Sequence, residues 1–261
     1  MNLRPTSIDQ KDIPHQLLSY MSEAKLYDSS CSPEAKTIFI EKDEGYFLKI
    51  APKDSLRNDS VMTEYFNLKG LSARVCEYLS LEQDYLVTQK ITGQDGIAPK
   101  YLDHPEKLCD VFAESLFQLH NVDFSDCPIK NKTISMLSDV KRNRPFNQYD
   151  EHLLKYIDLS DKTKAYRLLE NKKDILKNDA LLHGDYCLPN ILLNDFKLSG
   201  FIDVGNGGVG DRHYDIFWGI WTLQYNLHTN AYKDRFLDCY GRELIDMQRL
   251  TLCGIISALT W

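Results

Sequence analysis

The chain has 261 residues, of which 43 % are hydrophobic and 26 % are charged, and its formal net charge is −7. This length allows a sizeable core in one domain or two small lobes, and the composition is that of an ordinary globular protein rather than a disordered one. The negative net charge argues against a nucleic-acid partner, because binding nucleic acid requires clustered lysines and arginines. It favours cationic substrates.

The cysteine pattern and the first residues indicate the cellular compartment that we expect. Seven scattered cysteines without a C-x-x-C pair indicate neither a disulfide framework nor a zinc site. No apolar run approaches the length of a membrane span, and the start MNLRPTSIDQKD lacks the apolar core of a signal peptide. We therefore expect a cytoplasmic protein without membrane contact.

The N-terminal part of the chain predicts a five-stranded lobe with a helix between its strands. Apolar residues at helical spacing predict a first short helix at Ile13 to Lys25. One strand is predicted just before a serine-rich turn, and four more at Thr37 to Ile40, Tyr46 to Ile50, Val75 to Ser80 and Tyr85 to Ile91, with a helix at Leu56 to Lys69. The strands Thr37 to Ile40 and Tyr46 to Ile50 form a hairpin around Asp43-Glu44-Gly45.

Lys49 lies in an apolar strand, which is unusual unless its ammonium group has a partner. The functional interpretation is contact with the α- and β-phosphates of a nucleotide, and the alternative is an edge-strand lysine on the solvent face. Glu64 follows by fifteen residues in the next helix, a natural distance for the ion pair that positions such a lysine, although Asp59 is a second acid of the same helix.

The turn from Asp28 to Pro33 is rich in serine and has no glycine pattern. Phosphates could be met there by backbone N–H groups and by the hydroxyls of Ser29, Ser30 and Ser32.

From Pro105 onward the pattern predicts an α-rich second lobe. One helix presents an apolar face from Leu108 to Leu119 and ends at His120. Further helices are predicted at Leu153 to Ile157, Lys164 to Leu176, Tyr214 to Tyr225, Tyr232 to Tyr240 and Met247 to Leu259. We expect two domains, 1–92 and 93–261.

The segment from His183 to Asp203, HGDYCLPNILLNDFKLSGFID, carries the chemistry. Its apolar runs predict a hairpin with strands at Ile191 to Leu193 and Leu198 to Ile202. Asn190 and Asp203 offer the oxygen ligands that Mg²⁺ prefers. Asp185 is then available to orient and deprotonate an attacking hydroxyl, as the catalytic-loop Asp does in kinases.

The same segment has a structural interpretation, because Asn and Asp often serve turn geometry in an ordinary hairpin. Several such groups stand together here, after a His-Gly-Asp turn and before Gly205, Gly207 and Gly208. This combination favours the catalytic interpretation.

Three segments resemble the aminoglycoside phosphotransferases, most closely the aminoglycoside 3'-phosphotransferases (kanamycin kinases). HGDYCLPNI is similar to their catalytic loop, GFIDVGNGGVGDRHYDI to their metal-binding segment, and HNVDFSDCP to the end of the helix and loop before them. The resemblance covers nearly the whole chain. It implies an α+β, two-lobed protein-kinase-like fold with a small antiparallel β-sheet N-lobe and a larger, mostly α-helical C-lobe.

The resemblance also implies residue roles. Asp185 would be the catalytic Asp, and Asn190 and Asp203 would bind Mg²⁺. The hinge that holds adenine through backbone groups would include Gln89 and Ile91.

Phe47 would stack on the adenine, with plain core packing as an equal alternative. Asp211, Arg212 and Asp215 would form a buried network that fixes the loop after Asp203. His183 would be a packing and hydrogen-bonding support.

The substrate region differs from the family pattern. Where the family has acids, this chain has Tyr225 and Asn226 within TLQYNLH and Trp261 at the end of ISALTW, so a less acidic and more aromatic pocket is expected. Asp158 and Asp161 could line a cationic substrate's pocket or belong to a solvated face.

The expected enzyme transfers the γ-phosphoryl group of ATP or GTP, with Mg²⁺, to a hydroxyl of an aminoglycoside and so confers resistance. One alternative is a kinase of the same fold that acts on another small-molecule alcohol, either a metabolite or a different antibiotic. A nucleotide-binding regulatory protein without transfer is a second alternative, against which the intact Asp185, Asn190 and Asp203 argue. The expected partner is a small molecule, and the sequence does not indicate an oligomeric state.

Overall fold

The computed structural model describes residues 3–146 and 148–260, and contacts within the chain define two compact units. The first comprises Met1–Asp95 and Ile191–Gly205, and the second comprises Gly96–Asn190 and Asn206–Trp261. The domain boundary between 92 and 93 stays a prediction, whereas the contacts group 191–205 with the first unit rather than the second.

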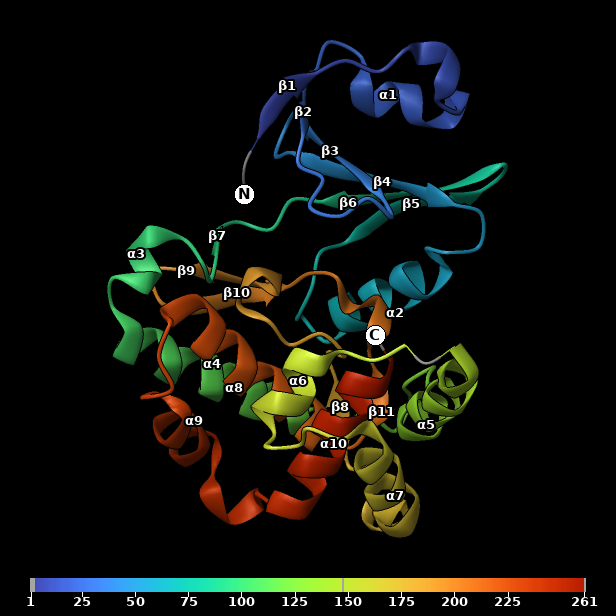
Figure 1. Ribbon diagram of the computed structural model, residues 1–261. Coiled ribbons are helices and arrows are strands. Elements are labelled where there is room, and N and C mark those ends of the chain that lie inside the picture. Colours follow the sequence, from blue (N-terminus) through green and yellow to red (C-terminus); the bar gives the residue numbers. More distant parts are fainter. Residues whose placement is uncertain (1–2, 147, 261) are drawn as a thin grey trace. The chain divides into compact units, whose positions relative to one another are not determined.

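Among the described residues, the first unit contains a six-stranded antiparallel sheet in the order β1-β2-β3-β4-β6-β5 (Figure 1). Its strands are β1 (Arg4–Thr6), β2 (Lys25–Asp28), β3 (Lys36–Glu41), β4 (Tyr46–Pro52), β5 (Val75–Ser80) and β6 (Gln83–Gln89). Alternate residues of the central strands, such as Ile38, Ile40 and Leu48, form a buried cluster on one face. The predicted hairpin is confirmed as β3–β4, and β1 adds a strand that the sequence did not predict.

The helix predicted over Ile13 to Lys25 is much shorter in the structure. A 3-10 turn at His15–Leu17 leads into α1 (Leu18–Met21), and the chain from Lys25 onward pairs with β3 as strand β2. Backbone groups that pair in a sheet cannot continue a helix. The helix therefore ends early.

Helix α2 (Arg57–Leu68) agrees with the prediction, and a buried carboxylate fixes its start. Asp84 on β6 is fully buried and accepts hydrogen bonds from the Leu56 N–H at 2.8 Å and the Tyr78 hydroxyl at 3.1 Å. Since the first N–H groups of a helix lack partners within it, this contact holds the helix start against the sheet.

The first unit also contains the hairpin predicted after the polar loop. Strands β9 (Ile191–Asn194) and β10 (Lys197–Phe201) pair antiparallel, and β7 (Gln94–Asp95) adds to β9. Gly93 has a φ of 132°, and a β-carbon there would lie 2.6 Å from the Leu193 carbonyl oxygen, so only glycine fits. At the other end, the Ser72 hydroxyl donates to the Phe201 carbonyl at 2.8 Å. The hairpin is therefore anchored just before Asp203.

The second unit is mostly helical, and α8 packs against both α4 and α10 (Figure 1). Its helices are α3 (Pro99–Leu102), α4 (Pro105–His120), α5 (Lys132–Asn143), α6 (Glu151–Tyr156), α7 (Lys162–Lys172), α8 (His213–Leu227), α9 (Lys233–Tyr240) and α10 (Met247–Thr260). Strand β8 (Ala180–Leu182) pairs antiparallel with β11 (Gly208–Gly210). The predicted helices are confirmed, and the sequence missed α3, α5 and the β8–β11 pair.

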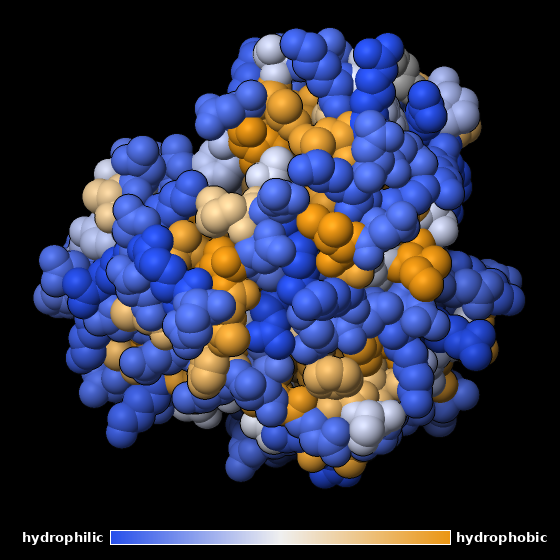
Figure 2. Space-filling view, turned by 90° about the horizontal axis from the view of Figure 1, so that it is seen from below, coloured by the Kyte–Doolittle hydropathy of each residue, from blue (hydrophilic) through white to orange (hydrophobic). Residues whose placement is uncertain are grey.

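Hydrophilic residues cover most of the face drawn in Figure 2, where apolar residues form separate smaller groups. Among residues 3–146 and 148–260, no helix combines the length and apolar character needed to cross a membrane.

Candidate functional site

Asp185 lies in the loop between β8 and a 3-10 turn at Leu188–Asn190. The Asn190 side-chain N–H donates to the Asp185 carboxylate at 2.8 Å and to its backbone carbonyl at 3.0 Å. Asn190 is buried, with 8 % of its surface exposed, whereas Asp185 is half-buried. The second unit thus presents a carboxylate whose orientation a neighbouring amide fixes.

The backbone before Asp185 is held by a second carboxylate. The N–H groups of His183 and Gly184 donate to the two oxygens of Asp215, at 2.6 and 2.9 Å, and Asp215 is fully buried at the start of α8. The Nε2 atom of His120 also lies within hydrogen-bond distance of the Asp215 carboxylate, at 3.3 Å. Asp215 therefore fixes the backbone next to Asp185.

Two neighbours of Asp185 support the loop. Buried His183 accepts the Asp185 N–H on Nδ1 at 3.3 Å, in agreement with its expected supporting role. Burial raises the pKa of the Cys187 thiol well above its usual value, and the Asp185 charge acts in the same direction. Cys187 is therefore a packing residue and not an activated thiol.

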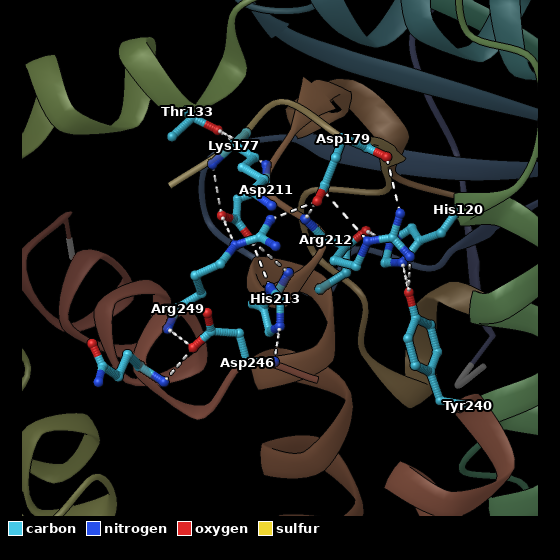
Figure 3. A network of polar contacts seen from close by, with 12 residues as sticks. His120, Thr133, Lys177, Asp179, Asp211, Arg212, His213, Tyr240, Asp246 and Arg249 are labelled. Carbon is cyan, nitrogen blue, oxygen red and sulfur yellow. Dashed lines mark hydrogen bonds and ion pairs between the residues drawn. The ribbon is translucent and has the colours of Figure 1, made fainter. Parts of the chain in front are cut away.

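A polar network joins α10 and the start of α8 to the segment before β8 (Figure 3). Arg249 donates to Asp211 at 2.8 Å and to Asp179 at 2.6 Å, while Arg212 donates to the Asp179 carbonyl at 3.1 Å. The Lys177 N–H donates to Asp211 at 2.9 Å. The sequence predicted that this network fixes the loop after Asp203. This location is wrong, because the hydrogen bonds hold residues 177–184 instead.

Arg249 is, with Asp179, a member of this network that the sequence did not identify. Arg249 is 5 % exposed in a helix whose other residues are uncharged, and a buried charge is tolerated only if it is paired. Burial raises the pKa of Asp211, but hydrogen bonds from His213, Arg249 and the Lys177 N–H outweigh this effect and lower it to about 2. Both partners are therefore charged at neutral pH.

In the first unit, the Lys49 ammonium lies between two carboxylates. Its Nζ is 2.8 Å from Asp59 on α2 and 3.1 Å from Asp203 after β10. Burial lowers the pKa of Lys49, but Asp203 and Asp59 outweigh burial and raise it above the usual value. The predicted Lys49–Glu64 pair is wrong: Asp59 takes this position, and Glu64 is exposed on α2.

The ion-paired group of Lys49, Asp59 and Asp203 depends on the backbone at Asp203 and Gly205. Asp203 has a φ of 55°, in the left-handed region that Asp tolerates better than most residues and that often marks functional positions. A β-carbon at Gly205 would lie 2.6 Å from Cγ and 3.1 Å from Cα of Asp59. Glycine at 205 therefore leaves the space that Asp59 occupies beside Lys49.

The residues predicted to hold a nucleotide already have contacts within the first unit. Phe47 is half-buried against Phe39, with ring centroids 5.1 Å apart. The Gln89 side chain donates to Glu44 at 2.7 Å. Half-buried Ile91 faces the α-carbon of Gly200, where an added β-carbon would touch it at 3.0 Å. Their nucleotide contacts remain predictions.

Ser30 closes its own turn. Its N–H donates to Asp28 at 2.8 Å, and its hydroxyl oxygen accepts the Thr37 N–H at 2.9 Å. The hydroxyl hydrogen is the donor that Ser30 would offer to a phosphate, and this role also remains a prediction.

The predicted substrate residues of α8 differ in exposure. Tyr225 is 63 % exposed and lines a pocket of about 750 Å³ together with Trp221 and Tyr156. The Asn226 amide instead donates to the Thr222 carbonyl at 2.8 Å and hydroxyl at 3.1 Å. The structure thus places Tyr225, rather than Asn226, at a pocket.

The two acids predicted for the substrate site, Asp158 and Asp161, do not line this pocket. Asp158 is exposed, and Asp161 caps α7 by accepting the Thr163 N–H at 2.7 Å. Trp261 lies outside the described residues. Substrate contacts of these three residues remain predictions.

The antiparallel sheet with its paired lysine and the helical unit with its Asp–Asn loop define the class of kinase-like phosphotransferases. The model of the phosphotransferase enzyme family matches residues 34–252, and the chain belongs to this family. The predicted α+β fold class and the prediction of a phosphotransferase are thereby confirmed.

The chain is 46 % identical to a probable aminoglycoside 3'-phosphotransferase of Lactococcus lactis subsp. lactis over 97 % of both chains. It is similar to the crystal structure of a type VIII aminoglycoside-3'-phosphotransferase, with a TM-score of 0.67 and 20 % identity over 93 % of this chain and 98 % of that one. An aminoglycoside phosphotransferase of Streptomyces rimosus, solved with ADP and streptomycin, gives a TM-score of 0.64 and 19 % identity over 87 % of this chain and 90 % of that one.

Proposed function

We propose that this enzyme transfers the γ-phosphoryl group of ATP or GTP to a hydroxyl of an aminoglycoside and so confers resistance to the antibiotic. The observation that carries the proposal is the 46 % identity, over nearly the full length of both chains, to a relative named for this activity. The neighbour solved with ADP and streptomycin supports a nucleotide and an aminoglycoside as substrates. A cytoplasmic location remains part of the proposal.

Asp185 is the proposed base that orients the acceptor hydroxyl and takes its proton. The hydrogen bond from Asn190 at 2.8 Å and the clamp of Asp215 on the preceding N–H groups restrict where the Asp185 carboxylate can point. Phosphoryl transfer depends mainly on positioning and charge, so a carboxylate held in this way suits the reaction.

Lys49 is proposed to contact the nucleotide phosphates. A lysine held by two carboxylates keeps its positive charge and a restricted position, so its ammonium is placed to donate to a phosphate oxygen. Phe47, Gln89, Ile91 and Ser30 are proposed to complete the nucleotide site.

Asn190 and Asp203 fit the ligand chemistry of Mg²⁺, which takes carboxylate and amide oxygens and keeps several of its waters. The Asn190 amide nitrogen is directed at Asp185, so the amide oxygen is the atom that would meet a cation. When bound, Mg²⁺ would neutralise charge on the transferring phosphates.

A second candidate is phosphoryl transfer to another small-molecule alcohol. The pocket beside α8 favours it, because within the described part of the chain its lining includes no carboxylate. Recognition of a polycation by ion pairs requires such groups.

A coupled ADP-release assay over a panel of aminoglycosides and other alcohols tests the function. We expect aminoglycoside-dependent ADP release that needs Mg²⁺, that Asp185→Asn abolishes, and that the exposed-surface control Asp238→Asn retains. ADP release with other alcohols alone would select the second candidate, and wild-type activity in Asp185→Asn would contradict the assignment of the base.

A further inference from the structure

A buried pair of aromatic rings connects α9 to the loop of the proposed base. His120 is the last residue of α4, Tyr240 is the last residue of α9, and both are buried. The Nδ1 atom of His120 lies 2.7 Å from the Tyr240 hydroxyl oxygen. Its Nε2 atom lies 3.3 Å from Asp215, which holds the backbone before Asp185. Nothing in the proposed phosphoryl-transfer step uses Tyr240.

Both rings of this pair are uncharged at neutral pH. Burial lowers the pKa of His120 and outweighs the opposite effect of Asp215, and burial raises the pKa of Tyr240. A neutral imidazole carries one N–H, so one nitrogen of His120 donates a hydrogen bond and the other accepts one. The partners of the two nitrogens decide which tautomer is present.

The partner of Nε2 is a group that accepts. Asp215 already receives the N–H groups of His183 and Gly184 on its two oxygens, and a carboxylate has no hydrogen to give. Nε2 therefore carries the hydrogen, because a nitrogen lone pair at 3.3 Å from the carboxylate would be repelled. This leaves Nδ1 of His120 as the acceptor and the Tyr240 hydroxyl as its donor.

The contact on the other side of Tyr240 requires the same direction. The Arg212 guanidinium can only donate, and its Nη1 gives a hydrogen bond to the Tyr240 oxygen at 3.4 Å (Figure 3). Arg212 is itself held by the Asp179 carbonyl, which accepts from Nη2 at 3.1 Å. The Tyr240 oxygen thus accepts from Arg212, and its own hydrogen points at Nδ1. The hydrogen bonds all run one way, from the guanidinium through the phenol and the imidazole to Asp215.

The Tyr240 hydroxyl is needed to hold the imidazole in place. A hydrogen bond on each nitrogen fixes the plane of the His120 ring, and each donor in such a chain strengthens the next. Without the hydroxyl, Nδ1 would be a buried acceptor that lacks a donor, which is costly, so the ring would turn. Asp215 would then lose one of the donors that fix its carboxylate.

We propose that Tyr240 is a positioning residue for phosphoryl transfer: its hydroxyl holds His120 as the tautomer protonated on Nε2, and this ring holds Asp215 against the backbone that precedes Asp185. The inference rests on the proposed function and extends it to α9, which contributes no residue to the proposed base, metal or nucleotide groups.

Tyr240→Phe tests this role, because it removes the hydroxyl and keeps the ring that packs edge to face on His120 and Phe117. In the ADP-release assay, kcat should fall about fivefold with KM for both substrates unchanged, since one hydrogen bond contributes about 1 kcal/mol. Tyr166→Phe removes a tyrosine hydroxyl from α7 in the same unit and should retain wild-type kcat. Thermal unfolding confirms that each variant is folded. Wild-type kcat in Tyr240→Phe, or a rise in KM with kcat unchanged, would overturn the positioning role.

Two variants of His120 test the path of the effect. The amide nitrogen of a glutamine reaches the position of Nε2, whereas that of an asparagine reaches only the position of Nδ1. His120→Gln should therefore keep kcat within about threefold of wild type, and His120→Asn should lower it about tenfold. Adding Tyr240→Phe to His120→Gln should cause little further loss, because the tyrosine acts through Nδ1. Equal kcat in the two His120 variants, or additive losses in the double variant, would contradict this path.

Nitrogen NMR of the histidine rings measures the tautomer without any substrate, and the signals lost in His120→Gln identify those of His120. We expect a hydrogen on Nε2 and none on Nδ1 at neutral pH. Amide hydrogen exchange at His183 and Gly184 should be faster in Tyr240→Phe than in the wild type. A hydrogen on Nδ1, or unchanged exchange at both amides, overturns the proposal. If the wild type phosphorylates no aminoglycoside, the proposed function fails, and these two measurements alone decide the hydrogen-bond chain.

Discussion

Replacing Asp59 with asparagine tests the ion pair that positions Lys49. The substitution keeps the size of the side chain and removes its charge, while Asp203 remains 3.1 Å from the lysine. A hydrogen bond between charged groups contributes about 1.5 to 3 kcal/mol. The side chains of Lys49 and Asp59 are 26 % and 21 % exposed, so solvent screens part of this interaction. We therefore expect a loss of about 2 kcal/mol, or about 30-fold in kcat/KM for the nucleotide.

The assay measures ADP release at varied nucleotide and saturating acceptor, and thermal unfolding confirms that the variant is folded. Glu64→Gln is the matched control: it removes a carboxylate from the same helix, and we expect wild-type kcat/KM. An equal loss in both variants, or a loss below about threefold in Asp59→Asn, would refute the assignment of Asp59 to Lys49.

Three further substitutions test residues that hold Asp59 beside Lys49, pair with buried Asp211, or fix the loop before Asp185. Gly205→Ala should displace Asp59 and reduce kcat/KM for the nucleotide, and in the Asp59→Asn background it should add little, because both changes act on one contact. Arg249→Met should lower the free energy of unfolding in urea by about 3 kcal/mol, because it leaves the carboxylate of Asp211 buried without its cationic partner. The folded-state pKa of Asp211, about 2, lies below its usual 3.8. Its contribution of about 2 kcal/mol is therefore complete above pH ~4 and is lost as the pH falls to ~2, and Arg249→Met should move this acid transition to higher pH. Asp215→Asn should lower kcat about tenfold with KM for the acceptor nearly unchanged, because an amide accepts only one of the two N–H groups that fix the loop before Asp185. Unchanged kcat in Asp215→Asn would contradict this positioning role.

Local pattern was sufficient to predict the elements whose residues alternate or repeat clearly. The β3–β4 hairpin and helix α4 follow from period-two and helical spacing, and the structure has both. Helix α5 does repeat at helical spacing, with Thr133, Met136 and Val140 buried, and this pattern was overlooked in the sequence. The edge strand β1, by contrast, has three residues and an exposed pattern and gives no periodic signal. Such elements form because neighbouring parts of the chain supply their partners.

The identity of the acidic partner of Lys49 could not be predicted from spacing. Asp59 and Glu64 lie on one helix, and either could face β4, depending on how the helix is rotated and where it begins. The start of that helix is held by Asp84, which accepts the Leu56 N–H from 28 residues further along the chain. A contact of this range leaves no pattern in the sequence around Lys49.

Arg249 illustrates the same limit in the second unit. Helix α10 is predicted from its apolar residues, and within that pattern a single arginine looks like an exposed position. Its partners Asp211 and Asp179 precede it by 38 and 70 residues, and only the packed structure brings them to it. Sequence signals identify which groups can carry charge, whereas burial and long-range contacts decide which of them are paired.

Both units use a buried carboxylate that accepts backbone N–H groups to hold a functional segment: Asp84 for α2 and Asp215 for the loop before Asp185. A backbone donor is the same whatever side chain its residue carries, so these bonds survive substitution at Leu56 or His183 but not removal of the acceptor. Each segment should therefore tolerate substitution of its donor residues better than substitution of the acceptor carboxylate. Variation at Leu56 affects packing alone, and variation at His183 also removes the acceptor of the Asp185 N–H, while loss of either acid releases the segment on which Lys49 or Asp185 depends.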